Sequence, residues 1–210
     1  MRPPTAIWRG VLVTTLVFAI SVLVMVALDS LPKGKAASKQ EARSERLLEP
    51  KEVQGVPCTT RVWYQPDGKL KSCVLARETA FGTLTLPAGS QVYFDAELRP
   101  ATVFLPRDTV IEGHCCIGEG HDTMTEFHPN GRLKFCNLRQ PELIDGIPCQ
   151  KSTAWIWMTQ GGAATTFHDN GKLSSCLLFA DVTIEGQTFK KGKHINLDPE
   201  GKIIARRGSP

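Results

Sequence analysis

The chain repeats one short pattern five times between residues 53 and 205, and this repetition constrains the fold more than any other feature. Each copy has an opening phrase, in which an apolar residue and a glycine precede a cysteine or a second apolar residue. A closing phrase follows, with an apolar residue, a polar turn, a base and usually an aliphatic residue. The opening phrases are VQGVPC, FGTLTL, IEGHCC, IDGIPC and IEGQTF, and the closing phrases are YQPDGKL, FDAELRP, FHPNGRL, FHDNGKL and LDPEGKI. Repeats of this kind predict a stack of supersecondary units.

The closing phrases predict β-hairpins, because Asp67-Gly68, Asn130-Gly131 and Asn170-Gly171 supply the positive φ angles of tight turns between alternating apolar positions. Two inward-facing columns are expected: Tyr64, Phe94, Phe127, Phe167 and Leu197 in one, and Leu70, Leu133, Leu173 and Ile203 in the other. The second copy has Leu98 and Pro100 in place of the glycine and the aliphatic residue, so we expect its turn to differ.

The fold class expected from these patterns is all-β. A single hairpin is marginal in water, so the copies must stack or pair to bury their apolar columns. Helical periodicity is absent after residue 50. We therefore expect residues 52–207 to form tandem β-hairpin repeats, arranged as an elongated antiparallel sheet or solenoid and preceded by one N-terminal transmembrane helix.

FHPNGRL and FHDNGKL resemble the bacterial variant of the MORN repeat (membrane occupation and recognition nexus), whose units carry an aromatic residue, a short Asn-Gly turn and Lys-Leu. The resemblance covers about half of residues 53–205. It implies an elongated β-scaffold that in some members acts at membranes, and it implies no catalytic residue. The cysteines depart from the usual MORN pattern.

Six of the seven cysteines follow the repeat. Cys58, Cys116 and Cys149 occupy the opening position, and Cys73, Cys136 and Cys176 lie five residues after the turn glycine. Leu86 and Phe189 replace the first set where Val103 and Arg206 replace the second, so three copies have both cysteines and two have neither. Independent buried thiols would not vary together. This favours disulfides within copies, namely Cys58–Cys73, Cys116–Cys136 and Cys149–Cys176.

Two other arrangements of the cysteines stay open at this point. Cys136 and Cys149 flank a hairpin across which they could pair, and all six could be reduced core residues. Disulfides suit a domain that is lean in apolar residues, because each covalent loop of about 15 residues contributes about 3 kcal/mol. They also imply an oxidising, extracytoplasmic location, periplasmic or at the cell surface.

The apolar run 11–28 predicts a membrane-insertion signal. Its 18 residues exceed the core of a cleavable signal and approach a bilayer span, so we expect residues 1–28 to be retained as a signal-anchor helix. Residues 29–51 are expected to form a charged, solvated tether. The tether's bases outnumber Arg2 and Arg9, which by the positive-inside rule places the domain in the cytoplasm. The cysteine argument places it outside, and we follow the cysteines.

Cys115 lies outside the cysteine pattern, next to Cys116 and close to His114, His121 and His128. The segment lacks the paired C-x-x-C spacing of a zinc site, so no metal site is expected. The remaining interpretations are an inert thiol, a reactive free thiol, or an intermolecular bond that makes a dimer through Cys115.

Two sets of residues are candidates for ligand binding. The base after each turn, including Lys69, Arg132 and Lys172, would line up into a basic ridge in a stacked array. Such a ridge could contact anionic headgroups or an envelope polymer, or it could only keep the turns soluble. The longest insert carries Trp155 and Trp157, which would be binding anchors if exposed and core residues if buried.

The function expected from the sequence is binding. We find no nucleophile elbow, phosphate loop or zinc-protease helix, so neither an enzyme nor a cofactor is expected. A formal charge of only +4 argues against a nucleic-acid binder. The first hypothesis is a membrane-anchored, extracytoplasmic module for an envelope polymer or a protein partner. The alternatives are a cytoplasmic MORN-like scaffold or antitoxin-type module with reduced cysteines, and a metal-binding or hydrolytic protein around residues 113–128.

Overall fold

The computed structural model describes residues 43–118, 123–153, 156, 158 and 163–204. They belong to the compact unit Ala42–Pro210, and the expected anchor 1–28 and the tether up to residue 42 lie outside them. In the described part of the chain, no helix has the length and apolarity needed to cross a bilayer. The fold there is all-β, as expected, with nineteen strands.

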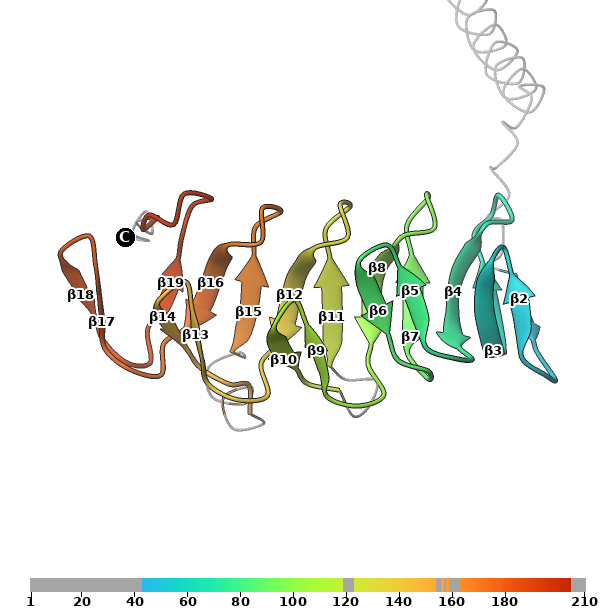
Figure 1. Cartoon of the computed structure of the whole chain (residues 1–210), viewed down its shortest axis with the longest axis horizontal. Coiled ribbons are helices and arrows are strands. Elements are labelled where there is room, and N and C mark those ends of the chain that lie inside the picture. Colours follow the sequence, from blue (N-terminus) through green and yellow to red (C-terminus); the bar gives the residue numbers. More distant parts are fainter. Residues whose placement is uncertain (1–42, 119–122, 154–155, 157, 159–162, 205–210) are drawn as a thin grey trace, which may run out of the picture. The chain divides into compact units, whose positions relative to one another are not determined.

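Eleven strands form one large antiparallel sheet (Figure 1). Its order along the sheet is β1-β3-β4-β7-β8-β11-β12-β15-β16-β19, with β2 also paired to β3. Consecutive hairpins therefore lie side by side in chain order, as the repeat predicts. The bounds are β1 Ser44–Arg46, β2 Lys51–Val53, β3 Val56–Tyr64, β4 Leu70–Leu75, β7 Gln91–Phe94, β8 Pro100–Phe104, β11 Met124–Phe127, β12 Leu133–Asn137, β15 Ala164–Phe167, β16 Leu173–Leu177 and β19 His194–Asn196.

The last four opening phrases form a second row of small hairpins, which lies over one face of the large sheet (Figure 1). The first opening phrase forms the turn between β2 and β3. These hairpins are β5 Thr79–Phe81 with β6 Leu84–Leu86, β9 Thr109–Ile111 with β10 His114–Cys116, β13 Glu142–Ile144 with β14 Ile147–Cys149, and β17 Val182–Ile184 with β18 Gln187–Phe189. We number the repeats units 1 to 5, with β2–β4 in unit 1, β5–β8 in unit 2, β9–β12 in unit 3, β13–β16 in unit 4 and β17–β19 in unit 5.

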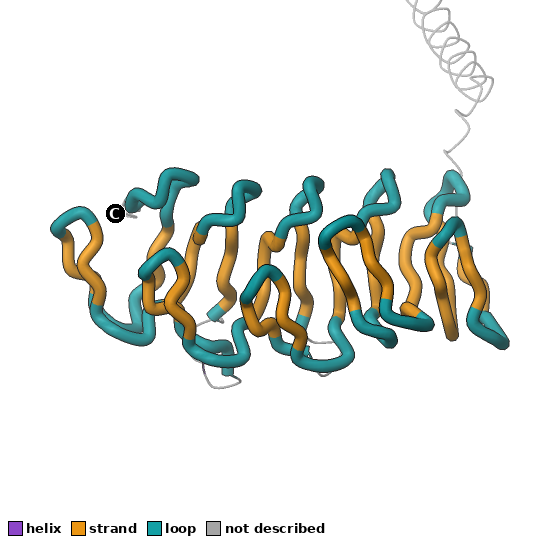
Figure 2. Tube along the Cα trace, viewed as in Figure 1, coloured by secondary structure: helices purple, strands orange, loops and turns teal. Residues whose placement is uncertain are grey.

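The turns of the small hairpins also fasten the two rows together. In three of them, and in the turn between β2 and β3, both central residues have positive φ, for example Asp145 at 50° and Gly146 at 80°, as the twist of a two-residue hairpin requires. The side chain before the glycine then reaches the sheet. Asp145 Oδ2 accepts the Leu173 N–H at 2.9 Å, and Gln54 Oε1 accepts the Leu70 N–H at 3.0 Å. Figure 2 shows that the turns of both rows point in the same direction.

The turns of the large hairpins differ in detail from expectation. Only the glycine has positive φ, for example 84° at Gly131, and it closes a three-residue loop in which the His128 N–H bonds the Arg132 carbonyl at 2.8 Å. Asn130 instead uses its side-chain oxygen, which accepts the Arg132 N–H at 3.1 Å. The register shifts after Glu126, as in a hairpin with a glycine bulge.

The turn of unit 2 was expected to differ, and that prediction was wrong. Leu98 adopts the glycine conformation with φ 60°, and the Asp95 N–H still bonds the Arg99 carbonyl at 3.0 Å. The left-handed region is costly for a residue with a Cβ. Repeat geometry imposed by the paired strands on both sides therefore overrides the local preference of leucine.

The core lies between the two rows, and both predicted columns are part of it. Phe94, Phe127, Phe167 and Leu197 are buried and Tyr64 is partly buried, while Leu70, Leu133 and Leu173 are fully buried and Ile203 packs at the margin. A further inward row crosses the whole sheet at the level of the closing cysteines. It consists of Val62, Cys73, Val92, Val103, Thr125, Cys136, Thr165, Cys176 and Ile195, each 2% exposed or less.

Candidate functional site

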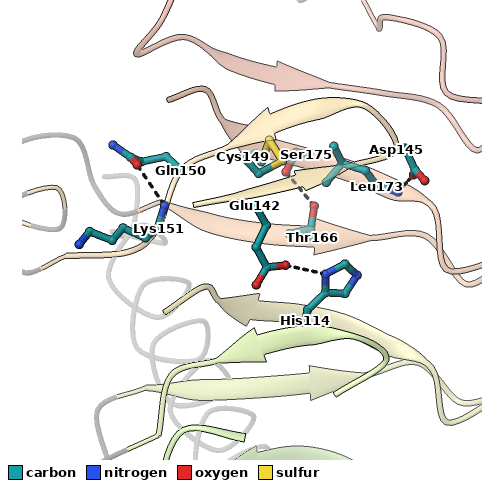
Figure 3. Close-up of a disulfide and its surroundings, with 10 residues drawn as sticks. His114, Glu142, Asp145, Cys149, Gln150, Lys151, Thr166, Leu173 and Ser175 are labelled. Atoms are coloured by element: carbon teal, nitrogen blue, oxygen red, sulfur yellow. Dashed lines mark hydrogen bonds and ion pairs between the residues drawn. A yellow bond between two sulfur atoms is a disulfide. The ribbon is translucent and has the colours of Figure 1, made fainter. Parts of the chain in front are cut away.

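Two disulfides connect the opening position of a unit to its closing strand. Cys58 on β3 bonds Cys73 on β4, and Cys149 on β14 bonds Cys176 on β16, with Cα atoms 5.8 and 5.6 Å apart. The second bond joins the small hairpin row to the large sheet (Figure 3). All four residues are completely buried, and both pairings are those predicted from the repeat.

Cys116 and Cys136 of unit 3 occupy the same register but are unbonded. Cys116 pairs with Leu138 across an isolated bridge, as Cys149 pairs with Leu178 in unit 4. Cys136 and Cys176 each lie two residues before that leucine, so both closing cysteines face the opening cysteine diagonally. A hydrogen bond with Cys136, together with burial, raises the pKa of the Cys116 thiol. The two thiols are thus in contact in the position where units 1 and 4 hold a disulfide.

Cys115 is a free thiol on the opposite side of β10 from Cys116. It pairs across the hairpin with Val110, which is exposed. Burial raises the pKa of its thiol, and the neighbouring Asp108 charge adds to the effect. Cys115 is therefore a weak nucleophile at neutral pH, because only the thiolate reacts quickly.

The histidines around Cys115 have structural partners. His114 Nδ1 lies 2.9 Å from Glu142 Oε2 on the next small hairpin, and its ring stacks on Phe167 (Figure 3). His128 Nε2 donates to the Phe167 carbonyl at 2.9 Å. His121 lies outside the described residues. Within residues 43–118, 123–153 and 163–204, no three metal-ligating side chains come together to hold an ion.

Two of the basic residues that follow the turns donate hydrogen bonds to the neighbouring turn, so they do not form an open ridge. Lys69 Nζ donates to the Ala96 carbonyl at 2.9 Å, and Arg132 Nη1 donates to the Asn170 carbonyl at 2.7 Å. Lys172 instead borders a groove of about 410 Å³ that Asp145 and Glu200 also line. Carboxylates next to the lysine reduce its attraction for an anion, so the ridge is mainly an inter-unit contact.

A ladder of side chains that the sequence analysis did not identify joins units 3, 4 and 5. Asn130 donates to the Asp169 carbonyl at 2.8 Å, and Asn170 donates to the Pro199 carbonyl at 3.0 Å. His168 repeats the role of His128, with its Nε2 donating to the Leu197 carbonyl at 2.9 Å. The recurring Phe-His-x-Asn-Gly letters were the available signal, since a polar pair that recurs at fixed turn positions can bond to the next turn.

Ile156, in the insert that carries Trp155 and Trp157, packs on the sheet face away from the small hairpins. Both tryptophans lie outside the described residues. Ile156 between them is buried against Ala163 and Leu177, and Leu177 points away from the inward Cys176. Ile156 therefore covers part of the outer face around β16.

The outer face over units 1 and 2 carries aromatic side chains that the sequence analysis also missed. Tyr93 and Phe104 contact edge to face with ring centroids 6.0 Å apart, and Gln91 Nε2 donates to the Tyr93 hydroxyl at 3.0 Å. The Arg61 guanidinium lies 6.0 Å from the centre of the Trp63 ring. These residues alternate with inward ones such as Val62 and Val92, so strand alternation could have identified them.

The described residues thus form a continuous sheet over a core that two disulfides cross-link. Comparison of the chain with protein-family models, with curated proteins and with solved structures gave no match.

Proposed function

We propose that this chain is a membrane-anchored, extracytoplasmic β-repeat protein that acts by binding, as a scaffold for a partner protein or an envelope polymer. The observation that carries the proposal is the pair of buried disulfides, Cys58–Cys73 and Cys149–Cys176. Bonds of this kind form and persist in oxidising compartments. They hold together an array whose apolar content is low for its length.

The proposal includes a third disulfide, Cys116–Cys136. Its support is the common register of the three cysteine pairs and the contact between the two thiols. On oxidation each thiol loses its proton, and the two electrons pass to the thiol-oxidising machinery of the compartment. Cys115 then remains as the single free thiol, available for a bond to a second copy of the chain.

The anchor and the scaffold role rest on the sequence. Residues 11–28 supply the apolar span, and residues 29–51 supply a tether that separates the domain from the membrane. The MORN-type likeness of the closing phrases favours a scaffold over an enzyme. Trp155 and Trp157 are the proposed ligand anchors, because they flank Ile156, which packs on the outer face.

Counting thiols tests this proposal. The protein is denatured in acid to trap thiols, labelled with a maleimide polymer with and without prior reduction, and resolved on a gel. One labelled cysteine per chain, or none where Cys115 bridges a dimer, rising to seven after reduction, is the expected result. Three would keep the two observed disulfides and remove the third, while seven without reduction would contradict an extracytoplasmic location.

The dimer through Cys115 is tested separately on a gel without reductant. A species of twice the chain mass that disappears in Cys115→Ser but persists in Cys116→Ser is the expected outcome. Serine at position 115 keeps the size of the side chain, so loss of the dimer would report the missing sulfur. A monomer in both variants would contradict the intermolecular bond.

A further inference from the structure

Strand β19 is the outermost strand of the large sheet among the described residues, and one of its edges is largely unpaired. Lys193 and Leu197 bond toward β16, since the Leu178 N–H donates to the Lys193 carbonyl and the Leu197 N–H to the Ser174 carbonyl. His194 and Asn196 therefore direct their backbone groups to the opposite edge. There the Asn196 carbonyl accepts the Ile204 N–H at 2.9 Å. The His194 N–H and carbonyl and the Asn196 N–H have no backbone partner at this edge among residues 43–204 that the structure describes.

The core of unit 5 is also less covered than the core of the other units. Phe189 occupies the opening position, and its counterparts Cys58, Leu86, Cys116 and Cys149 are each completely buried. Phe189 itself is only partly buried, and so is Ile184 in the same hairpin. In units 1 to 4 the next unit along the array covers this side, and unit 5 has no such neighbour among the described residues.

A groove of about 560 Å³ lies at this end, between β18, β19 and residues 203–204. Phe189, Ile195, Ile203 and Ile204 supply its apolar lining, and Lys190, Lys193 and His194 supply basic groups. None of the described residues that line it is acidic. Lys190 is paired with Asp181 at 2.8 Å, whereas Lys193 has no ion pair in the described part of the chain. The groove thus combines an apolar floor, a positive rim and unpaired backbone groups.

The chain's own next residues are a poor match to this groove. Continuing the repeat by five residues beyond Gly201 assigns Arg206 to the inward row that Ile195 occupies on β19. Arg206 and Arg207 would bring positive charge to an apolar position beside Lys190 and Lys193. An isolated charge is costly in such a place, and like charges add to the cost.

We propose that the free edge of β19 and its groove bind an extended acidic segment of a partner protein, which adds a strand to the large sheet. The partner's backbone pairs with His194 and Asn196, its apolar side chains contact Phe189 and Ile204, and its carboxylates meet Lys193. Strand addition at an exposed edge takes affinity from backbone hydrogen bonds and specificity from alternate side chains. This deepens the proposed binding function and rests on it only for the claim that the domain acts by binding.

The test measures binding of fluorescent peptides to the full chain, purified with intact disulfides in mild detergent. The probe is a peptide of about nine residues that alternates glutamate and valine, and it spans about 30 Å when extended. One control peptide replaces glutamate with lysine, and a second has the probe sequence with N-methyl groups on alternate backbone nitrogens. We expect only the first peptide to bind, with affinity that falls as salt is added.

Variants locate the binding to this groove. Lys193→Glu reverses the charge of the rim, and we expect it to weaken the probe about tenfold or more. Ile204→Asp disturbs the half-exposed apolar lining with a similar loss. The matched control is Lys71→Glu, an exposed lysine on β4 outside this groove, which should leave binding unchanged. Retained disulfides and an unchanged unfolding midpoint would show that each variant is folded.

Several outcomes would overturn the proposal. Equal binding of the glutamate and lysine peptides would remove the charge argument, and full binding of the N-methylated peptide would remove strand addition. Binding that appears only after deletion of residues 205–210 would assign the edge to the chain's own segment. Binding of anionic lipid vesicles through Lys193, without peptide binding, would assign it to a membrane. The thiol count is independent of these results, so either claim can fail alone.

Discussion

Units 2 and 4 solve the same packing problem with different chemistry. Unit 4 joins Cys149 to Cys176 by a disulfide, whereas unit 2 places Leu86 and Val103 at the equivalent positions, and both are completely buried. The order and pairing of the strands are otherwise repeated. An apolar pair can therefore fill the space of a disulfide, which means that the disulfides add a covalent constraint to a fold that already packs without them.

The two units also differ at the large turn. Unit 4 has an Asn-Gly turn that bonds to the next turn through His168 and Asn170. In unit 2 the turn closes on itself, because Arg99 pairs with Asp95 at 2.7 Å and with Glu97 at 2.8 Å. Unit 2 is thus stabilised by ion pairs within its own turn and by apolar packing. Unit 4 is stabilised by a disulfide and by hydrogen bonds to the next unit.

The largest effect is expected from removing the covalent bond of unit 4. Cys149→Ala with Cys176→Ala opens a loop of 27 residues, which should lower the free energy of unfolding by about 3.5 kcal/mol in the chain-entropy model. Urea unfolding under oxidising conditions measures it. In reductant the variant and the parent should approach each other, and a gap that stays unchanged in reductant would show that packing rather than the bond was lost.

Leu86→Ala in unit 2 tests the apolar solution. Deleting a fully buried leucine side chain should cost about 3 kcal/mol, through lost burial and the cavity that remains. This loss should have the same size with and without reductant, since unit 2 contains no cysteine. A loss below about 1 kcal/mol would mean that the neighbouring disulfides, not the apolar pair, hold unit 2 in place.

Leu98 tests how far the array forces a local conformation. Leu98→Gly should be more stable than Leu98→Ala by about 1 kcal/mol, because both remove the side chain and only glycine relieves the positive φ. The alanine variant is the matched control for lost packing. Equal unfolding free energies would indicate that the turn relaxes to another conformation once the leucine is removed.

The ladder between units should contribute less. Asn130→Ala removes one bond to Asp169 and one to the Arg132 N–H, and we expect a loss of about 1 kcal/mol at this exposed turn. Glu97→Ala changes the same repeat position in unit 2, where the side chain forms only an exposed ion pair, and should cost less than about 0.5 kcal/mol. Thermal unfolding of the two variants side by side would show whether the order is reversed.

The smallest effect is a pH dependence confined to the turn of unit 2. Burial raises the pKa of Asp95, but hydrogen bonds from the Arg99 backbone and guanidinium outweigh it and lower the pKa below its usual value. A lowered pKa means that the ionised carboxylate favours the fold, so its contribution is present above the ordinary Asp pKa and is lost as the pH falls through the lowered one. Asp95→Asn should slightly reduce the loss of unfolding free energy between neutral and acid pH, measured by urea unfolding at several pH values. The same pH dependence in the variant and the parent would contradict this.

The repeat made much of this architecture predictable. The hairpins, both inward columns and two of the disulfide pairings followed from letters that recur at fixed positions. The separate row of small hairpins could not be predicted. An opening phrase of six residues has the same sequence pattern whether it extends a sheet or folds over one. The conformation of Leu98 was missed for the opposite reason, since local preference argued against the geometry that the array imposes.

The site was less predictable than the fold. The sequence singled out Lys69 and Arg132 as a basic ridge, yet their side chains reach carbonyls of neighbouring turns whose distance no local pattern contains. The groove beside Phe189 exists because no further unit among the described residues covers that side of unit 5. The sequence of a single unit does not indicate whether another unit covers it.

The sequence by itself determined the period of the array, the inward residues of each hairpin and the cysteine positions, because side-chain alternation and turn chemistry are local properties of the chain. The tertiary structure alone decided which layer each hairpin joins and which polar side chains bridge successive turns. Those features depend on contacts between residues far apart in the chain, such as Asp145 with Leu173, 28 positions apart, and Asn130 with Asp169, 39 positions apart, and such distances are set only when the units stack.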